Sequence, residues 1–263
     1  MLEMKPDLIV SLTSFPAAID YAILAIKSLL KGNLLPDKLI LYLTFDQFKE
    51  CGLPEELKSL ERENEIFEIR DYPHDIRSYR KLIPALKDFP DAVIVTVDDD
   101  VYYDKDMLSD LLTLHNKYPD AIIANRVKIV DPSQPYKNWK KIRWYDFLTE
   151  KIKIDPRIIQ TGVGGVLYPP HALKAEMLDE KLFMNLAPTT DDIWFWASAI
   201  ANGRTVIPMP YGRHNKPKAA GKPKELSLKT VNFKAGTSRN DEALKAVFSH
   251  YPDIKEKIDS DSI

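Results

Sequence analysis

Cysteine is almost absent from this sequence, and its scarcity limits how the fold can be held together. The 263 residues include one cysteine, Cys51, so no disulfide can form within the chain. We therefore expect a protein of a reducing compartment such as the cytoplasm. Glycine is scarce too, and three of its nine residues fall between positions 162 and 165.

Long apolar runs and a strong net charge are also missing. No stretch is apolar for long enough to span a bilayer, and no basic segment with an apolar core opens the sequence, so we expect no secretion signal. Peripheral attachment at the inner face of the cytoplasmic membrane needs only a small basic or amphipathic patch, and it stays open. The formal net charge of -2 predicts no general attraction to nucleic acid.

Short apolar runs alternate with stretches of helical spacing in the first half of the chain. The runs predict buried strands over 8–12, 38–43, 66–69, 93–97 and 121–124. Helices are predicted over 22–30, 54–60, 79–86 and 104–118, and later over 190–202 and 241–248. This order predicts an α/β fold with a mostly parallel central sheet flanked by helices.

Three consecutive carboxylates follow the fourth predicted strand. Asp98, Asp99 and Asp100 come directly after the run 93–97. Clustered like charges repel one another and resist burial unless a cation neutralises them. Because ligands bind beyond the carboxyl ends of parallel strands, the triplet indicates an oxygen-ligand site for Mg or Mn. Acidic residues that open a solvated loop are the alternative.

Further polar groups are predicted at the same edge of the sheet. Thr13 and Ser14 follow the first strand, and Asp75, Arg77 and Lys81 follow the third. Basic side chains at a helix start oppose the helix dipole, and a bound phosphate would reverse that penalty. A solvated helix turn is the simpler explanation.

Candidates in the second half are a glycine run and an acidic helix start. Gly164 and Gly165 allow the backbone to approach a ligand, or they form a turn. Asp191 and Asp192 begin a helix, where a carboxylate can act as a general base or be stabilised by the dipole alone.

Two aromatic residues and one histidine complete the candidates. Trp194 and Trp196 would form a wall for a sugar ring, or they belong to the core. His214 lies in a basic loop, where it would supply an imidazole to a metal or be solvated.

Together these segments resemble bacterial glycosyltransferases of the GT-A fold in the family 2-like superfamily, of the kind found with capsule and lipopolysaccharide genes. The matching segments are 11–16, 75–81, 96–101, 164–170 and 191–196. The resemblance implies a GT-A-like Rossmann-type sandwich. It also implies a metal-dependent, inverting glycosyltransferase that moves a sugar from a UDP-sugar to a hydroxyl of a glycan or lipid-linked acceptor in surface polysaccharide synthesis.

The resemblance implies a role for each candidate. The donor would contact Thr13, Ser14, Asp75, Arg77, Lys81, Asp98, Asp99, Gly164 and Gly165. A Mn or Mg ion would be bound by Asp100, Asp98 and His214. Asp192 would be the catalytic base, with Asp191 as its neighbour, and Trp194 and Trp196 would contact the acceptor.

The same reasoning divides the chain into parts. A GT-A-like catalytic domain is predicted over 1–212, with a nucleotide-binding half (1–124) and an acceptor-binding, catalytic half (125–212). Residues 213–263 contain many Lys, Gly and Pro residues at first, and they predict a mobile basic lid followed by a C-terminal helix.

Three other functions stay open at this stage. A haloacid-dehalogenase-type phosphatase or phosphotransferase would use Asp98 and Asp100, although that motif usually follows the first strand. A sugar nucleotidyltransferase shares the sheet, but it should carry a glycine-rich loop where residues 11–16 have no glycine. A non-enzymatic carbohydrate-binding module would account for the aromatic residues but not for the carboxylates.

Overall fold

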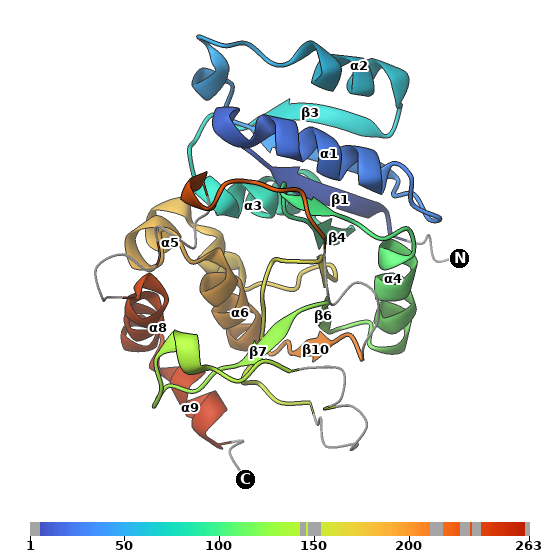
Figure 1. Ribbon diagram of the computed structural model, residues 1–263. Helices are drawn as coiled ribbons and strands as arrows, with labels where there is room; N and C mark the ends of the chain where they lie inside the picture. Colours follow the sequence, from blue (N-terminus) through green and yellow to red (C-terminus); the bar gives the residue numbers. More distant parts are fainter. Residues whose placement is uncertain are drawn as a thin grey trace.

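The computed structural model describes residues 6–142, 146, 154–210, 218–226, 232 and 238–260 (Figure 1). Its centre is a seven-stranded sheet in the order β10-β6-β9-β4-β1-β2-β3. The strands are β1 (Leu8–Thr13), β2 (Lys38–Leu43), β3 (Phe67–Asp71), β4 (Val93–Thr96), β6 (Ile122–Ala124), β9 (Val166–Tyr168) and β10 (Val206–Pro208). Two small sheets pair β5 (Val101–Tyr102) with β11 (Lys218–Ala219), and β7 (Val127–Ile129) with β8 (Ile158–Gln160).

The seven-stranded sheet is mostly parallel. β9 alone among its strands runs antiparallel to its neighbours β4 and β6, and the other pairings are parallel. The prediction of an α/β fold with a mostly parallel sheet between helices is confirmed.

Helices connect the strands and cover both faces of the sheet. They are α1 (Ile19–Leu29), α2 (Glu55–Glu63), α3 (Ile83–Asp88), α4 (Met107–Lys117), α5 (Glu180–Leu186), α6 (Asp191–Ala201), α8 (Arg239–His250) and α9 (Pro252–Ser260). Short 3-10 helices are η1 (Pro16–Ala18), η2 (Phe45–Phe48), η3 (Arg77–Lys81), η4 (Tyr136–Asn138), η6 (Ala175–Leu178) and η8 (Lys224–Leu226).

The core has two halves, one on each face of the sheet. Side chains alternate along a strand, so Val10 and Leu12 of β1 pack with α1, α2 and α4, whereas Ile9 faces α3, α5, α6, α8 and α9. Figure 1 shows α5, α6 and α8 gathered on one side of the sheet and α4 on the other. Because both faces are covered, the central strands β1, β2 and β4 are apolar at most of their positions.

Several helix boundaries differ from the sequence predictions for local reasons. The helix predicted from Asp104 begins at Met107, with Asp106 at its N-cap position. The stretch predicted as one helix over 79–86 is η3 followed by α3. Pro84 lies within the first two positions of α3, where a missing N–H costs nothing, so the proline shifts the helix start as the sequence suggested.

Among the described residues, no helix has the length and apolar character needed to cross a bilayer.

Truncation of Ile94 is expected to destabilise the protein strongly. Ile94 is fully buried on β4, between Ile9 of β1 and Tyr168 of β9. We expect I94A to lower the free energy of unfolding by about 2–5 kcal/mol, because the substitution leaves a cavity in the core. Helices cover both faces of the sheet, so the surrounding side chains cannot easily fill it. Urea unfolding measures this loss. The control L35A removes a side chain that is 48% exposed and should change stability by about 0.5 kcal/mol or less. Equal effects of the two substitutions would contradict the assigned core.

Candidate functional site

The candidate site lies where the direction of the sheet's connections reverses. The chain proceeds from β1 to β2 and β3 on one side, and then returns to place β4 on the other side of β1. In open α/β sheets, the crevice beyond the carboxyl ends at such a point is the usual place for a ligand. Thr13 ends β1 there, Ser14 follows it, and Asp98 follows β4.

Asp99 is the most buried carboxylate of the triplet and contacts both Ser14 and Lys222. The Ser14 hydroxyl donates to Asp99 Oδ2 at 2.6 Å, and Lys222 Nζ lies 2.7 Å from Asp99 Oδ1. The same ammonium lies 3.1 Å from Asp100 Oδ2. Burial raises the pKa of Asp99, and Lys222 and Ser14 only partly offset that rise.

Asp98 belongs to a second group of charges around Lys81. Lys81 Nζ lies 3.1 Å from Asp98 Oδ1 and 3.1 Å from Asp191 Oδ2, and the Ser78 hydroxyl donates to the other Asp191 oxygen at 2.7 Å. Burial lowers the pKa of Lys81, but Asp191 and Asp98 outweigh it and hold that pKa well above its usual value. Lys81 is therefore a buried ammonium that links the end of β4 to the start of α6.

Asp192 lies close to Lys81, Asp98 and Asp191, and its carboxyl group has a raised pKa. The Gly162 amide donates to Asp192 Oδ1 at 3.0 Å. Burial, and then repulsion from Asp191, raise the pKa of Asp192 to about 7, against the opposing effect of Lys81. A carboxyl group that titrates near neutral pH can give or take a proton there, which suits general acid–base chemistry.

Gly162 leaves the space that the Lys81 ammonium occupies. A Cβ at position 162 would lie 2.5 Å from Lys81 Nζ and 3.1 Å from Asp98 Oδ1. By contrast, a Cβ at Gly165 would meet Met107 Sδ at 3.1 Å, so this glycine packs against α4. The Gly164 carbonyl accepts from the Asn125 amide at 2.8 Å. The glycine that faces the charged group is thus Gly162, rather than the predicted Gly164 and Gly165.

Arg80 connects the carboxyl ends of β1 and β2 by hydrogen bonds. Its guanidinium is buried and donates to the Thr13 hydroxyl at 2.8 Å, to the Ser14 carbonyl at 3.2 Å and to the Thr44 hydroxyl. The sequence predicted Thr13 as a contact of the donor, and in this structure its hydroxyl is bonded to Arg80 and to the Tyr42 carbonyl.

Asp75 and Arg77 lie away from the carboxylates. Both are exposed, and Asp75 accepts from the Arg77 amide at 3.1 Å. Arg77 donates to the Pro188 carbonyl at 3.3 Å. Of the basic segment predicted to bind phosphate, only Lys81 reaches the charged group around Asp98.

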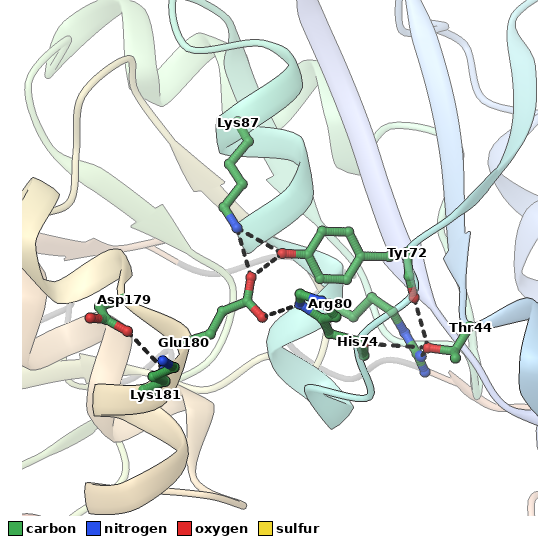
Figure 2. Close-up of polar contacts among 8 residues, drawn as sticks. All are labelled: Thr44, Tyr72, His74, Arg80, Lys87, Asp179, Glu180 and Lys181. Carbon is green, nitrogen blue, oxygen red and sulfur yellow. Dashed lines mark hydrogen bonds and ion pairs between the residues drawn. The ribbon is translucent and has the colours of Figure 1, made fainter.

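A surface cluster ties the segment after β3 to α5 (Figure 2). Glu180 accepts from Lys87 at 2.7 Å and from the Tyr72 hydroxyl, and it lies 2.8 Å from His74 Nδ1. Burial raises the pKa of Glu180, but these three partners outweigh it and lower the pKa to about 2. Thr44 donates to the Tyr72 carbonyl at 2.9 Å, so the cluster also adjoins the residues around Arg80.

The predicted acceptor contacts of Trp194 and Trp196 need correction. Both indoles are 0% exposed, and both belong to the core that covers one face of the sheet. Their Nε1 groups donate to the carbonyls of Met177 at 2.8 Å and Pro156 at 2.9 Å. Neither ring is accessible to a sugar, because α6 buries both together with Ile193 and Ile200.

The predicted metal site is not assembled among the described residues, where no group of three or more His, Cys, Asp or Glu residues could hold an ion. His214 lies outside the described residues. Asp98 and Asp100 suit Mg or Mn in ligand chemistry, and their side chains stay 23% and 32% exposed. In this structure the lysines supply the positive charge that these carboxylates need.

Comparison with known proteins gives fold neighbours only. No family model and no curated protein match the sequence. One similar solved structure is the bifunctional IspDF from Campylobacter jejuni, with 16% identity and a TM-score of 0.42 over 84% of this chain. This chain spans about half of that protein, 54% of its length. Another is a 4-diphosphocytidyl-2C-methyl-D-erythritol synthase, with 8% identity and a TM-score of 0.46, covering 87% of this chain and all of the other.

These neighbours correct the functional prediction. Neither is a glycosyltransferase, so the predicted sugar transfer from a UDP-sugar to a glycan or lipid-linked acceptor is contradicted and is not carried further. At such low identity and TM-score the likeness concerns the fold, so residue roles have to be argued from the site itself.

Replacement of Asp192 by asparagine is expected to change the pH dependence of stability. With a pKa of about 7 when folded and about 3.9 when unfolded, Asp192 binds its proton more tightly in the folded state. The free energy of unfolding therefore falls as the pH rises between these values. D192N keeps an oxygen acceptor for the Gly162 amide but carries no charge, so we expect a shallower fall and higher stability than the parent protein above about pH 7.

Urea unfolding from about pH 5 to about pH 8 measures this difference. Asp99, whose pKa is raised as well, keeps part of the slope in the variant. D259N is the matched control, because the Asp259 side chain is 54% exposed and its ion-pair partner is Lys255, so its curve should run parallel to that of the parent protein. A parallel curve for D192N too would show that Asp192 has an ordinary pKa.

Proposed function

We propose that this chain is a nucleotidyltransferase, an enzyme that joins a nucleotide to a phosphorylated sugar or polyol. One observation carries the proposal: two lysines flank the carboxylates at the end of β4, where the sheet's connections reverse. Lys81 pairs with Asp98, and Lys222 pairs with Asp99 and Asp100. Two cationic groups beside one carboxylate run suit a reaction in which two phosphate-bearing molecules meet.

The reaction is a displacement at phosphorus. An oxygen of the acceptor's phosphate forms a bond to the α-phosphorus of a nucleoside triphosphate, and the bond from that phosphorus to the leaving diphosphate breaks. The electron pair of the broken bond leaves with the diphosphate. A phosphate dianion needs no base to remove a proton, so positioning and neutralisation of charge are the main tasks.

The residues of the site fit these tasks. Lys81 is a permanent cation beside Asp98, and the ammonium of Lys222 can pass from a carboxylate to a phosphate at little cost in desolvation. Asp98 and Asp100 would hold Mg or Mn, which supplies positive charge to the phosphates when bound. Asp192 is suited to accept a hydrogen bond from a hydroxyl of the sugar or polyol.

The other open functions fit less well. A phosphatase that used Asp98 as its nucleophile would need a free carboxylate, and Asp98 is paired with Lys81 at 3.1 Å. A carbohydrate-binding module would need exposed aromatic rings, and Trp194 and Trp196 are buried. The absence of glycine between Ser11 and Pro16 means that side chains rather than a glycine-rich loop would have to contact the triphosphate.

The division of the chain is part of the proposal. Residues 1–124 would bind the nucleotide, residues 125–212 would bind the phosphorylated acceptor, and residues 213–263 would cover the site and complete the fold. A cytoplasmic location is proposed as well, because Cys51, the one cysteine, is exposed and unpaired.

Release of pyrophosphate tests this function directly. The protein is incubated with each ribonucleoside triphosphate, Mg²⁺ and a panel of sugar and polyol phosphates, and pyrophosphate is measured with a coupled pyrophosphatase. We expect release only when a triphosphate and an acceptor phosphate are both present. K81M and D98N should each lower kcat by about 100-fold or more, because each removes one partner of the Lys81–Asp98 pair that faces the phosphates.

D259N again serves as the control, since it changes an exposed carboxylate outside the site and should keep full activity. Thermal unfolding with and without each triphosphate provides a second readout, because a ligand that binds the folded state raises the midpoint. The proposal is wrong if no triphosphate raises that midpoint and no combination releases pyrophosphate.

A further inference from the structure

Arg126 is a half-buried arginine at the edge of the sheet where Asp98 lies. It comes two residues after β6, and β6 runs in the same direction as β4 because both are antiparallel to β9. The Thr161 amide donates to the Arg126 carbonyl at 2.9 Å. The next amide, that of Gly162, donates to Asp192 Oδ1. The backbone of Arg126 is therefore attached beside the turn that holds the Asp192 carboxylate.

The Arg126 guanidinium has no hydrogen-bond or ion-pair partner within the parts of the chain that the structure describes. A charge that is partly withdrawn from water normally has a partner, because an unpaired charge is costly to bury. The other described arginines that are buried or half-buried all contact carboxylates, hydroxyls or carbonyls, and they are Arg70, Arg80, Arg157 and Arg204. An anion from outside the chain would supply the partner that Arg126 lacks.

The hydroxyl of Tyr136, in η4, lies near both Arg126 and Asp192. Burial raises the pKa of Tyr136, and the charge of Asp192 raises it further. Arg126 lowers this pKa, against smaller opposing effects of Asp191 and Asp241. Because such effects fall off with distance, a negative and a positive group lie close to this one hydroxyl.

Asp192 also has an oxygen to offer. Its Oδ1 accepts from the Gly162 amide, whereas its Oδ2 has no partner among the described residues, and the side chain is half-buried rather than closed off. A carboxylate oxygen accepts hydrogen bonds from hydroxyl groups, and a guanidinium binds two oxygens of a phosphate side by side. A ligand that carries a phosphate and hydroxyl groups would therefore suit Arg126 and Asp192 together.

We propose that Arg126 binds the phosphate of the acceptor, while Tyr136 and Asp192 face the hydroxyl groups of the same molecule. The inference rests on the proposed function and deepens it, because it names the residue that distinguishes a phosphorylated sugar or polyol from an unphosphorylated one. A phosphate of the nucleoside triphosphate has the same chemistry, so the experiments below separate these two sources.

Equilibrium binding of glycerol 3-phosphate, followed by phosphorus NMR, tests the site without any need for turnover. We expect R126M to bind it at least about tenfold more weakly than the parent protein, because a charge-assisted contact is lost. R126K keeps the charge but not the planar fork, and its affinity should lie between the two. R62M is the matched control: Arg62 is 61% exposed on α2, which packs against β3 at the other end of the sheet.

R62M should bind glycerol 3-phosphate like the parent protein. Equal affinities of R126M and R62M would overturn the inference, and so would a parent protein that binds no glycerol 3-phosphate.

Urea unfolding separates a ligand contact from a structural one. An arginine without a partner stabilises the fold little, so R126M should be as stable as the parent protein or more stable. Glycerol 3-phosphate should raise the unfolding midpoint of the parent protein and of R62M, but not that of R126M. A clear loss of stability in R126M would show that Arg126 supports the fold instead, and it too would overturn the inference.

Kinetics identify which phosphate Arg126 binds. In a protein that releases pyrophosphate, R126M should raise the KM for the acceptor phosphate about tenfold and leave the KM for the triphosphate unchanged. A raised KM for the triphosphate alone would assign Arg126 to the nucleotide and overturn the inference.

The outcomes also separate this inference from the proposed function. Pyrophosphate release by R126M with both KM values of the parent protein would leave the nucleotidyltransferase standing and remove the role of Arg126. Binding of glycerol 3-phosphate that depends on Arg126, in a protein that never releases pyrophosphate, would support the phosphate site and remove the nucleotidyltransferase.

Discussion

The Lys81 ammonium neutralises the two buried carboxylates that lie where β4 meets α6, and the structure at this end of the sheet depends on that charge. Asp98 follows β4, Asp191 begins α6, and both carboxylates lie 3.1 Å from the same nitrogen. Burial of either charge without a partner would cost several kcal/mol, so each stays buried because the others are there. The cluster also fixes the turn at Gly162, whose missing side chain leaves room for the ammonium. One residue of η3 thus joins two elements that lie far apart in the sequence.

Lys222, the second lysine of the site, is attached to the fold by fewer contacts than Lys81. Lys81 comes from η3, which packs against β1 and β2. Its neighbours Tyr79 and Arg80 are buried, so a movement of η3 would disturb the core. Lys222 comes from a segment attached by a two-residue strand pairing and the bond from Ala220. Two ammonium groups of similar charge therefore differ in how easily they leave their carboxylates.

The sequence predicted the sheet better where burial was complete on both faces. β1, β2 and β4 carry apolar residues at most positions. Such a run can be recognised in the sequence without knowing which strand it pairs with. β7, β8 and β9 have three residues each, so no period can be read from them. In the site, Ser14, Lys81, Asp98 and Asp192 were found because they follow strands or begin a helix. Lys222 was missed because a pairing of two-residue strands far apart in the sequence leaves no local pattern.

The error about function has a related cause. The structure brings together the predicted groups at the carboxyl ends of β1 and β4, where ligands usually bind in open α/β sheets. Such groups suit a ligand that carries phosphates, as the proposed function requires, but they do not say which bond is broken. That choice depends on the acceptor, and the residues predicted to contact it, Trp194 and Trp196, are core residues of α6. An aromatic pair in a predicted helix is as typical of a buried core as of a surface that binds a sugar. The predicted acceptor therefore had no support from residues 125–212, which were expected to bind it.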